Sequence, residues 1–203
     1  MTEPAESGGE RQSEIEIIYE QRDQGVADRN LLGPLMLFQR SDLKDDLCVC
    51  LARWFAMYSE HHQPFRLYFS AVDSSNDSTL EEKLRQLTEA LETLDKALND
   101  SSERGLSERI IRLAKPFGGS LGTRRSIEDL GKIIADTRNE LVHHAVKKGR
   151  QGARGPDLLR LTYQCELLLI YCLTSVVTGS PRSALEMIKG KQAVAKRLRV
   201  IED

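Results

Sequence analysis

The sequence predicts an all-α protein, a helical bundle preceded by a short non-helical N-terminal extension. Three observations favour this fold class. Apolar residues recur at intervals of three and four through most of the chain after residue 40, which is the period of a helix packed through one face. Capping residues, prolines and glycines fall at the ends of these apolar segments. No alternation of strands and helices, internal repeat or phosphate-binding glycine loop breaks the pattern.

The composition bounds the size of the protein and its choice of partners. A chain of 203 residues, 40% hydrophobic and 30% charged, is long enough to bury one sizeable core and polar enough to stay soluble. The formal net charge of −2 provides no general attraction to nucleic acid. Any contact with RNA must therefore depend on a local basic patch.

Signals for export, membrane insertion and metal binding are missing from the sequence. The first residues are acidic and polar, unlike a signal peptide, and the longest apolar run, residues 167–173, is shorter than the ~20 residues of a membrane span. The four cysteines have neither CxxC spacing nor histidines at zinc spacing. We expect a cytoplasmic protein with buried free thiols and with no membrane span, metal or cofactor.

The chain is expected to have two parts, a disordered tail with an extended arm over residues 1–40 and a helical domain over residues 41–203. Residues 1–14 hold no large apolar side chain after Met1, so they cannot bury enough surface to offset the entropy of ordering. Residues 15–38 hold two short apolar clusters broken by Gly33 and Pro34, which favours extended arms or short strands.

The helical domain is predicted to begin at Ser41, an N-cap candidate followed by an acid. Its first helix has an apolar stripe made of Leu43, Leu47, Leu51, Trp54, Phe55 and Tyr58. Pro64 is expected to close this helix, and residues 65–72 are expected to form a short second one before the polar loop 73–77.

The clearest helix is predicted over residues 78–98. Ser78 and Glu81 have the spacing of a capping box. One face of the helix is lined by Leu80, Leu84, Leu87, Leu91, Leu94 and Leu98. The same spacing suits a coiled-coil seam, but three heptads without a known partner favour packing in the core of the protein.

Two further helices follow. Residues 106–114 form a short amphipathic helix stopped by Pro116. Ser126, with Asp129 three residues later, caps the next helix. The buried face of this helix is expected to contain Leu130, Ile133, Ile134, Thr137 and Leu141.

The last part of the chain is predicted to hold the central helix. Residues 158–177 are apolar nearly all round, between Pro156 at a first helical position and Gly179, as expected in a core or a subunit interface. An amphipathic helix then runs from Arg182 to Ile201 and is interrupted at Gly190.

Arg138, Asn139 and His143, in the helix that begins after Ser126, are the candidate catalytic residues. Metal-independent RNA cleavage needs a group that removes the 2′-hydroxyl proton, a group that protonates the leaving oxygen, and positive charge for the developing phosphorane. Imidazole titrates near neutrality, and guanidinium stays charged and binds phosphate through a planar fork.

The helical period separates these three residues. Asn139 and His143 lie one turn apart on one face, whereas Arg138 is rotated by about 140° from His143. Two copies of the helix that meet across a two-fold axis would bring an arginine and a histidine into one cleft. The spacing therefore predicts an obligate homodimer with a composite site.

Alternatives to this assignment remain at the motif. His144 could replace His143 as the catalytic histidine, Arg138 could pair with Glu140 or another acid, and His143 could be a helix-end residue that interacts with the helix dipole. A basic, glycine-rich loop follows and would supply phosphate contacts. The expected RNA-binding residues are His144, Lys147, Lys148, Arg150 and Arg154.

The order of these segments resembles the C-terminal HEPN domain of ApeA-like anti-phage defence proteins. Arg138 and His143 form the R-x4-H motif of the HEPN superfamily, and Asn139 supplies its polar second residue. The resemblance covers roughly residues 35–179. The segments that carry it are Leu47 with Trp54-Phe55, residues 84–92, residues 106–110, residues 137–143 and the helix over residues 167–179.

The resemblance implies an endoribonuclease of an abortive-infection system that cleaves RNA, with tRNA as a plausible target, and leaves a 2′,3′-cyclic phosphate. Family members usually carry a β-rich domain ahead of the HEPN unit, so an upstream sensor domain is expected outside this chain. Asp95 stands where the family pattern has a histidine or another basic residue. That departure puts a contribution of its helix to an active site in doubt.

Two other functional classes compete with the nuclease. A catalytically silent HEPN-type module would dimerise and bind RNA, a nucleotide or a protein without turnover. A structural helical domain with a coincidental motif would place Arg138 and His143 away from any cleft or symmetry axis.

Overall fold

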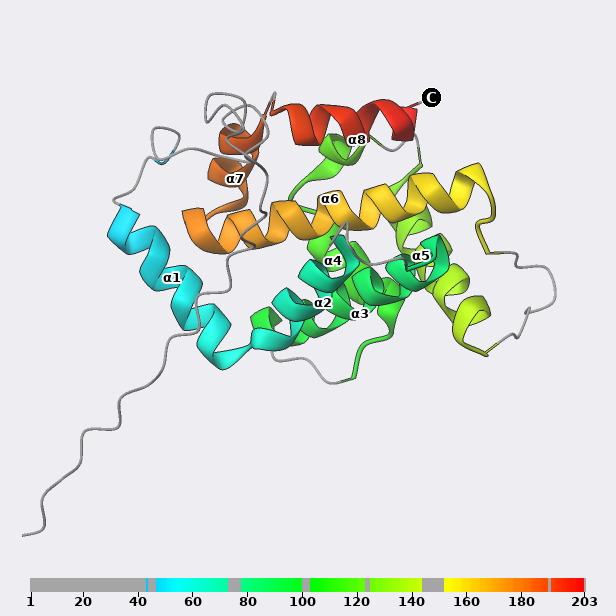
Figure 1. Cartoon of the computed structure of the whole chain (residues 1–203), viewed down its shortest axis with the longest axis horizontal. Helices are drawn as coiled ribbons and strands as arrows, with labels where there is room; N and C mark the ends of the chain where they lie inside the picture. Colours follow the sequence, from blue (N-terminus) through cyan, green and yellow to red (C-terminus); the bar gives the residue numbers. More distant parts are fainter. Residues whose placement is uncertain are drawn as a thin grey trace, which may run out of the picture.

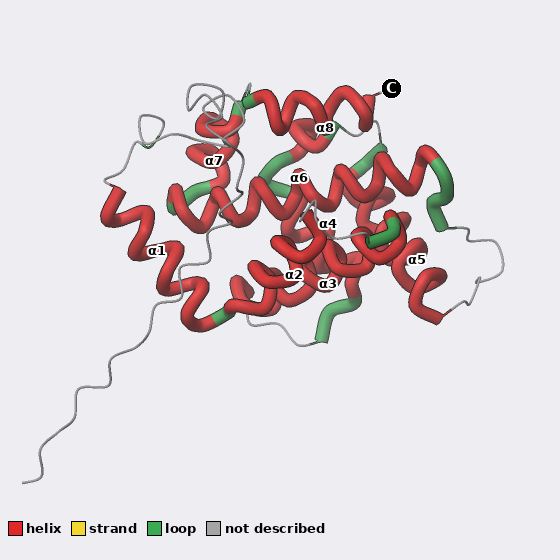
Figure 2. The backbone as a smooth tube through the Cα atoms, viewed as in Figure 1, coloured by secondary structure: helices red, strands yellow, loops and turns green. Residues whose placement is uncertain are grey.

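Every regular element in the described part of the chain is a helix. The computed structural model describes residues 43, 47–72, 78–99, 103–122, 125–143, 152–189 and 191–202. Within these ranges there is no strand (Figure 2), which confirms the all-α prediction. The predicted tail and arm over residues 1–40 lie outside the described residues, so the division at residue 40 stays a prediction.

Helix α6 (Pro156–Thr178) runs through the middle of the molecule, and the other helices pack around it (Figure 1). Helix α3 (Leu80–Asn99) lies on one side, and α7 (Pro181–Ile188) and α8 (Gln192–Glu202) lie on the other. Pro156 starts α6, and Gly179, with φ +75°, ends it in the left-handed region. Both ends were predicted.

The length and composition of α6 alone would allow it to cross a membrane. However, 78% of an apolar stretch of 18 residues in this helix is buried inside the protein. It is apolar nearly all round because α3 covers one side and α7 and α8 cover the other.

The leucine face of α3 points into the core, as predicted, and its N-cap differs from the prediction by one residue. Leu84, Leu87, Leu91 and Leu94 are buried, whereas Leu98 is 44% exposed. Thr79 Oγ1 accepts a hydrogen bond from Glu82 N at 3.2 Å, so the cap is Thr79. The predicted Ser78 cap is wrong, because the helix begins at Leu80.

Helices α1 (Leu47–Glu60) and α2 (His62–Val72) meet at a sharp corner near His61. The prediction that Pro64 ends the first helix is wrong. Pro64 lies in the first turn of α2 and is buried, where its missing N–H interrupts no helical hydrogen bond. The prediction that the first helix starts at Ser41 and includes Leu43 is wrong, because Leu43 is described and is not helical and α1 begins at Leu47.

Helices α4 (Leu106–Ala114) and α5 (Ile127–His143) pack against each other, with the short 3₁₀ helix η4 (Gly118–Leu121) between them in sequence. Ser126 Oγ accepts a hydrogen bond from Asp129 N at 3.0 Å, as predicted. A Cβ built on Gly131 of α5 would lie 2.9 Å from the carbonyl oxygen of Ser107. Glycine is therefore needed for this close approach.

Two acids inside the bundle join helices through ion pairs. Asp95 of α3 is fully buried and accepts hydrogen bonds from Arg109 Nη1 at 3.2 Å and from Arg112 Nε at 2.8 Å, both on α4. Glu166 of α6 pairs with Arg197 of α8. Asp95 therefore joins α3 to α4, and Glu166 joins α6 to α8.

The four cysteines are free thiols, and three of them are buried. Burial raises the pKa of the Cys165 and Cys172 thiols well above the usual range. The prediction that all four are buried is wrong for Cys48, which lies exposed on α1.

Candidate functional site

The C-terminal half of α5 positions the candidate catalytic residues. One face of the helix is anchored in the core, because Leu130, Ile134 and Thr137 are buried and Ile133 and Leu141 pack against the core cluster. This is the predicted face. Arg138 and Asn139 follow Thr137 directly and are partly exposed, so the packing of their neighbours fixes the backbone that carries them.

Arg138 and Asn139 form a contact of their own. Arg138 Nη1 donates to Asn139 Oδ1 at 3.4 Å, near the upper limit for a hydrogen bond. No carboxylate in the described part of the chain pairs with Arg138. The alternative in which Arg138 pairs with Glu140 is wrong, because the Glu140 side chain has other partners.

Glu140 binds the segment that leads into α6, residues 152–154, which we call the strap. Its carboxylate accepts a hydrogen bond from Gly152 N at 2.8 Å and forms an ion pair with Arg154. The hydrogen bond from Arg154, followed by that from Gly152, lowers the pKa of Glu140. Glu140 is therefore a carboxylate at neutral pH, and its charge is matched by Arg154.

Thr137 provides the second anchor of the strap. Its Oγ1 accepts from Ala153 N at 2.9 Å and donates to Ile133 O at 2.7 Å. A Cβ on Gly152 would lie 2.9 Å from Thr137 Cα and from Glu140 Oε2. Only glycine allows the strap to approach α5 this closely.

The remaining predicted site residues lie at or beyond the end of α5. His143 is the last residue of that helix, and its backbone is one helical turn from Asn139, as predicted. The side chain of His143 lies outside the described residues, as do His144, Lys147, Lys148 and Arg150. Arg154 is described, with a side chain that is 65% exposed and paired with Glu140.

A cavity of about 280 Å³ lies between the strap, the end of α5 and the start of α3 and α6. Its walls include Glu81, Glu140 and Arg154. The two acids outnumber the one arginine, so this cavity disfavours a phosphate group. The surface formed by Arg138 and Asn139 is better suited to an anion than this cavity.

Sequence reasoning missed Thr137, Glu140 and Gly152 as parts of the site framework. Thr137 was predicted only as a buried helix residue, and the partners of Glu140 are 12 and 14 residues away in the chain. The only local signal was Gly152, which lies shortly before Arg154 and the helix-starting Pro156. No periodicity connects it to α5.

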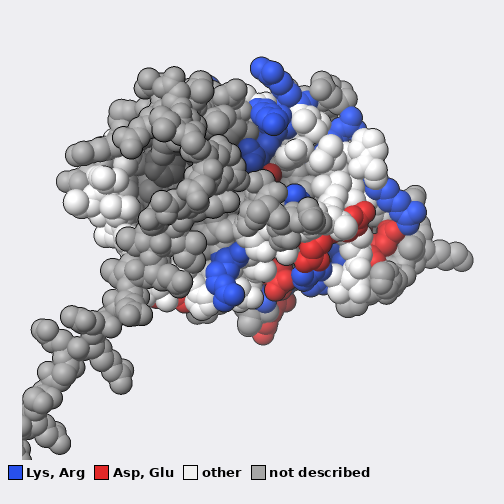
Figure 3. Space-filling view, in the orientation of Figure 1, with Lys and Arg blue, Asp and Glu red and all other residues white. Residues whose placement is uncertain are grey.

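Charge on the visible face of the molecule is mixed rather than uniformly basic. In Figure 3, Lys and Arg lie along the upper edge over α8, whereas Asp and Glu alternate with them lower down. Lys196 and Arg199 of α8 are exposed. Among the residues described, no three His, Cys, Asp or Glu side chains gather as a metal site would require.

The helical bundle thus carries an Arg-Asn pair near the end of a core-anchored helix, with a histidine one turn further along the same helix. The sequence model of the Apea-like HEPN family matches residues 59–181. The chain belongs to this family, and the predicted resemblance is confirmed. The match begins at residue 59 rather than near residue 35, so it leaves out nearly all of α1. No curated protein and no solved structure matches the chain.

Proposed function

We propose that the protein is a metal-independent endoribonuclease in which Arg138 and His143 act on one phosphate. The observation that carries this proposal is the state of Arg138. Arg138 is partly exposed, and its guanidinium contacts Asn139 in the described part of the chain, while the neighbouring acid Glu140 binds the strap. An arginine that is not neutralised by an acid is suited to bind an RNA phosphate.

The reaction is a transesterification. The 2′-oxygen of the ribose attacks the adjacent phosphorus and loses its proton to a general base, and the bond from phosphorus to the 5′-oxygen breaks. The departing 5′-oxygen takes up a proton, which leaves a 2′,3′-cyclic phosphate and a 5′-hydroxyl. His143 would transfer a proton, and Arg138 would stabilise the charge on the phosphorane oxygens. Asn139 would orient His143 from the preceding turn of the helix.

Substitution of each motif residue tests the activity. Arg138→Ala and His143→Ala are each expected to reduce RNA cleavage in EDTA by about 10²–10⁴-fold, the usual contribution of a charge-stabilising or proton-transferring group. His62→Ala and Arg182→Ala, which change exposed residues of α2 and α7, are matched controls expected to cleave normally.

The outcome separates the competing classes. Full cleavage by both motif variants would contradict the assignment of Arg138 and His143. Wild-type protein that binds RNA and never cleaves it would indicate the silent HEPN-type module. Circular dichroism of each variant checks that the helices are intact, because Arg138 is partly exposed and its loss opens no core cavity.

The proposed biological role is antiviral defence by RNA degradation in the cytoplasm, with tRNA as a candidate substrate. Family membership supports this role. Induced expression should then arrest growth, whereas Arg138→Ala expressed at the same level should not. Equal toxicity of both forms would contradict the role.

A further inference from the structure

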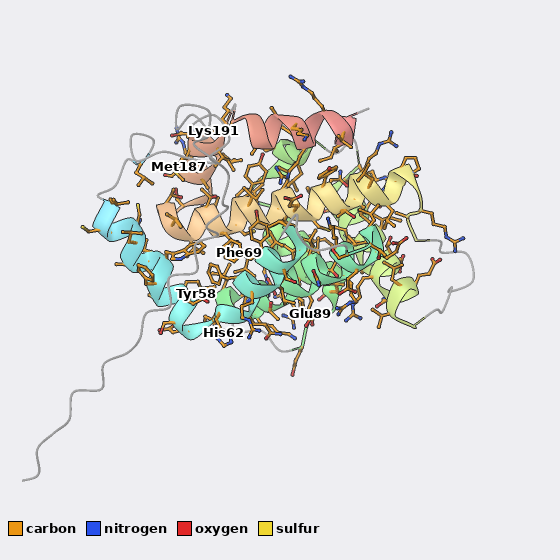
Figure 4. The ribbon with its side chains drawn as sticks, in the orientation of Figure 1. Tyr58, His62, Phe69, Glu89, Met187 and Lys191 are labelled. Atoms are coloured by element: carbon orange, nitrogen blue, oxygen red, sulfur yellow. The ribbon has the colours of Figure 1, made fainter. Side chains whose placement is uncertain are left out.

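An apolar groove lies between α1, α2 and α6, far along the chain from the candidate nuclease residues. It encloses about 270 Å³. Its walls include Leu47, Leu51 and Trp54 of α1, Phe69 of α2, and Leu173 and Val177 of α6. Leu51 is 44% exposed and Phe69 is 50% exposed, so the groove reaches the surface. Figure 4 labels Phe69 on α2, on the side that faces the end of α6.

Helices α1 and α2 carry most of the large apolar side chains that are exposed in the described part of the chain. Large hydrophobic residues that are exposed in the described ranges are Val49, Leu51, Phe55, Tyr58, Phe69, Leu98, Val142 and Leu159. The first five belong to α1 and α2. Two of these five, Leu51 and Phe69, line the groove, and exposed apolar side chains that line a groove mark a binding surface.

The part of the chain that precedes α1 ends at the groove. Leu43 is itself one of the lining residues. Five residues earlier stands Phe38, the last of four consecutive apolar residues that begin at Leu35. Five residues span at most ~17 Å when extended. Residues 35–38 are therefore tethered within reach of the groove whatever path the chain takes.

We propose that residues 35–38 of the same chain bind in this groove. A segment on so short a tether has an effective concentration in the millimolar range, far above that of a second molecule in solution. The groove, with a volume of about 270 Å³, accommodates a few side chains, as a short apolar segment would supply. The short tether and the small volume both favour residues 35–38 over a second copy.

The binding of this segment can be measured through Trp54. Trp54 is the one tryptophan of the chain and lines the groove, so its emission wavelength and its quenching by acrylamide report whether the groove is covered. We expect the double variant Leu37→Asp/Phe38→Asp of the full chain to show red-shifted emission and stronger quenching. Burying two carboxylates in an apolar groove is unfavourable, so the segment would leave it.

The double variant Gln39→Asp/Ser41→Asp is the matched control. It adds the same two charges next to the segment and removes no apolar side chain. Its emission and quenching should equal those of the wild type. Circular dichroism and thermal unfolding show whether each variant keeps its helices.

The alternative occupants of the groove produce different results. Emission and quenching of the Leu37→Asp/Phe38→Asp variant equal to those of the wild type would overturn the proposal. So would a wild-type signal that changes on roughly hundredfold dilution, because a second copy dissociates by mass action and a tethered segment does not. A second groove variant, Phe69→Ser, should expose Trp54 in the same way as the double variant.

Discussion

Glu140 is next to Asn139 in the chain, yet its side chain binds the strap rather than Arg138. Its carboxylate compensates the charge of Arg154 and leaves the guanidinium of Arg138 without an acidic partner in the described part of the chain. Arg154 is therefore less suited to bind an RNA phosphate than Arg138. The acid beside Arg154 would compete with a phosphate.

The strap should make the stability of the protein depend on pH. Because partners lower the pKa of Glu140 in the folded state, its contribution is present above the ordinary glutamate pKa of about 4.3. That contribution is lost as the pH falls through the lowered folded-state pKa. We expect Glu140→Gln to lower the melting temperature at neutral pH, and the difference from wild type to shrink on acidification below about pH 4.

Thermal unfolding monitored by circular dichroism at several pH values checks this expectation. Glu128→Gln, on the exposed face of the same helix, is the control and should follow the wild type throughout. A Glu140→Gln difference that stays constant down to the lowest pH would mean that the carboxylate charge does not hold the strap.

Asp95 is fully buried and pairs with two arginines of α4. Asp95→Ala would leave the buried guanidinium of Arg109 without this partner, and it should lower the free energy of unfolding by about 3–5 kcal/mol. Glu92→Ala, on the same helix and paired with Lys96 at a more exposed position, should cost less than about 1 kcal/mol. Denaturant titration measures the loss of unfolding free energy in both variants. A loss for Asp95→Ala as small as that for Glu92→Ala would show that the buried ion pair is dispensable.

At the scale of the element, α5 depends on close packing against α4. A methyl group at Gly131 would approach Ile111 Cγ1 to 2.6 Å and the Ser107 carbonyl oxygen to 2.9 Å. Overpacking of this kind costs about 1–3 kcal/mol, more than the gain of up to about 1 kcal/mol in helix propensity. Gly131→Ala should therefore destabilise the protein.

Gly119→Ala is the control for this prediction, since a methyl group placed on this glycine of η4 would have no atom within 4 Å. It should leave the midpoint of denaturant unfolding nearly unchanged. A Gly131→Ala variant as stable as wild type would show that α4 and α5 can separate without cost.

At the scale of the whole molecule, the proposed activity depends on two copies of α5. Arg138 and His143 lie on one continuous helix, and the helical period separates their positions by about 140° around its axis. This geometry supports a composite site built from two protomers. The homodimer remains a proposal.

Mixing two inactive variants tests the composite site. In a heterodimer of Arg138→Ala and His143→Ala, one site lacks both residues and the other retains both. Random exchange makes about half of the dimers heterodimers, each with one intact site of two, so cleavage should recover to about a quarter of the wild-type rate. The two variants should be inactive when assayed separately. No recovery after verified subunit exchange would place Arg138 and His143 of one chain in the same site.

The helices that bury one continuous face followed from the sequence. The limits of α4 and α6, the leucine face of α3 and the buried face of α5 are set by local periodicity, capping and the conformations of proline and glycine. The candidate residues Arg138, Asn139 and His143 were recognisable for a related reason, because their spacing on one helix is itself the signal.

Only the tertiary structure decided which charges are compensated and which surfaces stay open. The pairing of Glu140 with Arg154 joins residues 14 positions apart, and that of Asp95 with Arg112 joins residues 17 apart. The apolar stripe of α1 was visible in the sequence, but its exposure at Leu51 and Phe55 was not. Periodicity shows which residues share a helical face, whereas the packing of distant segments determines what that face meets.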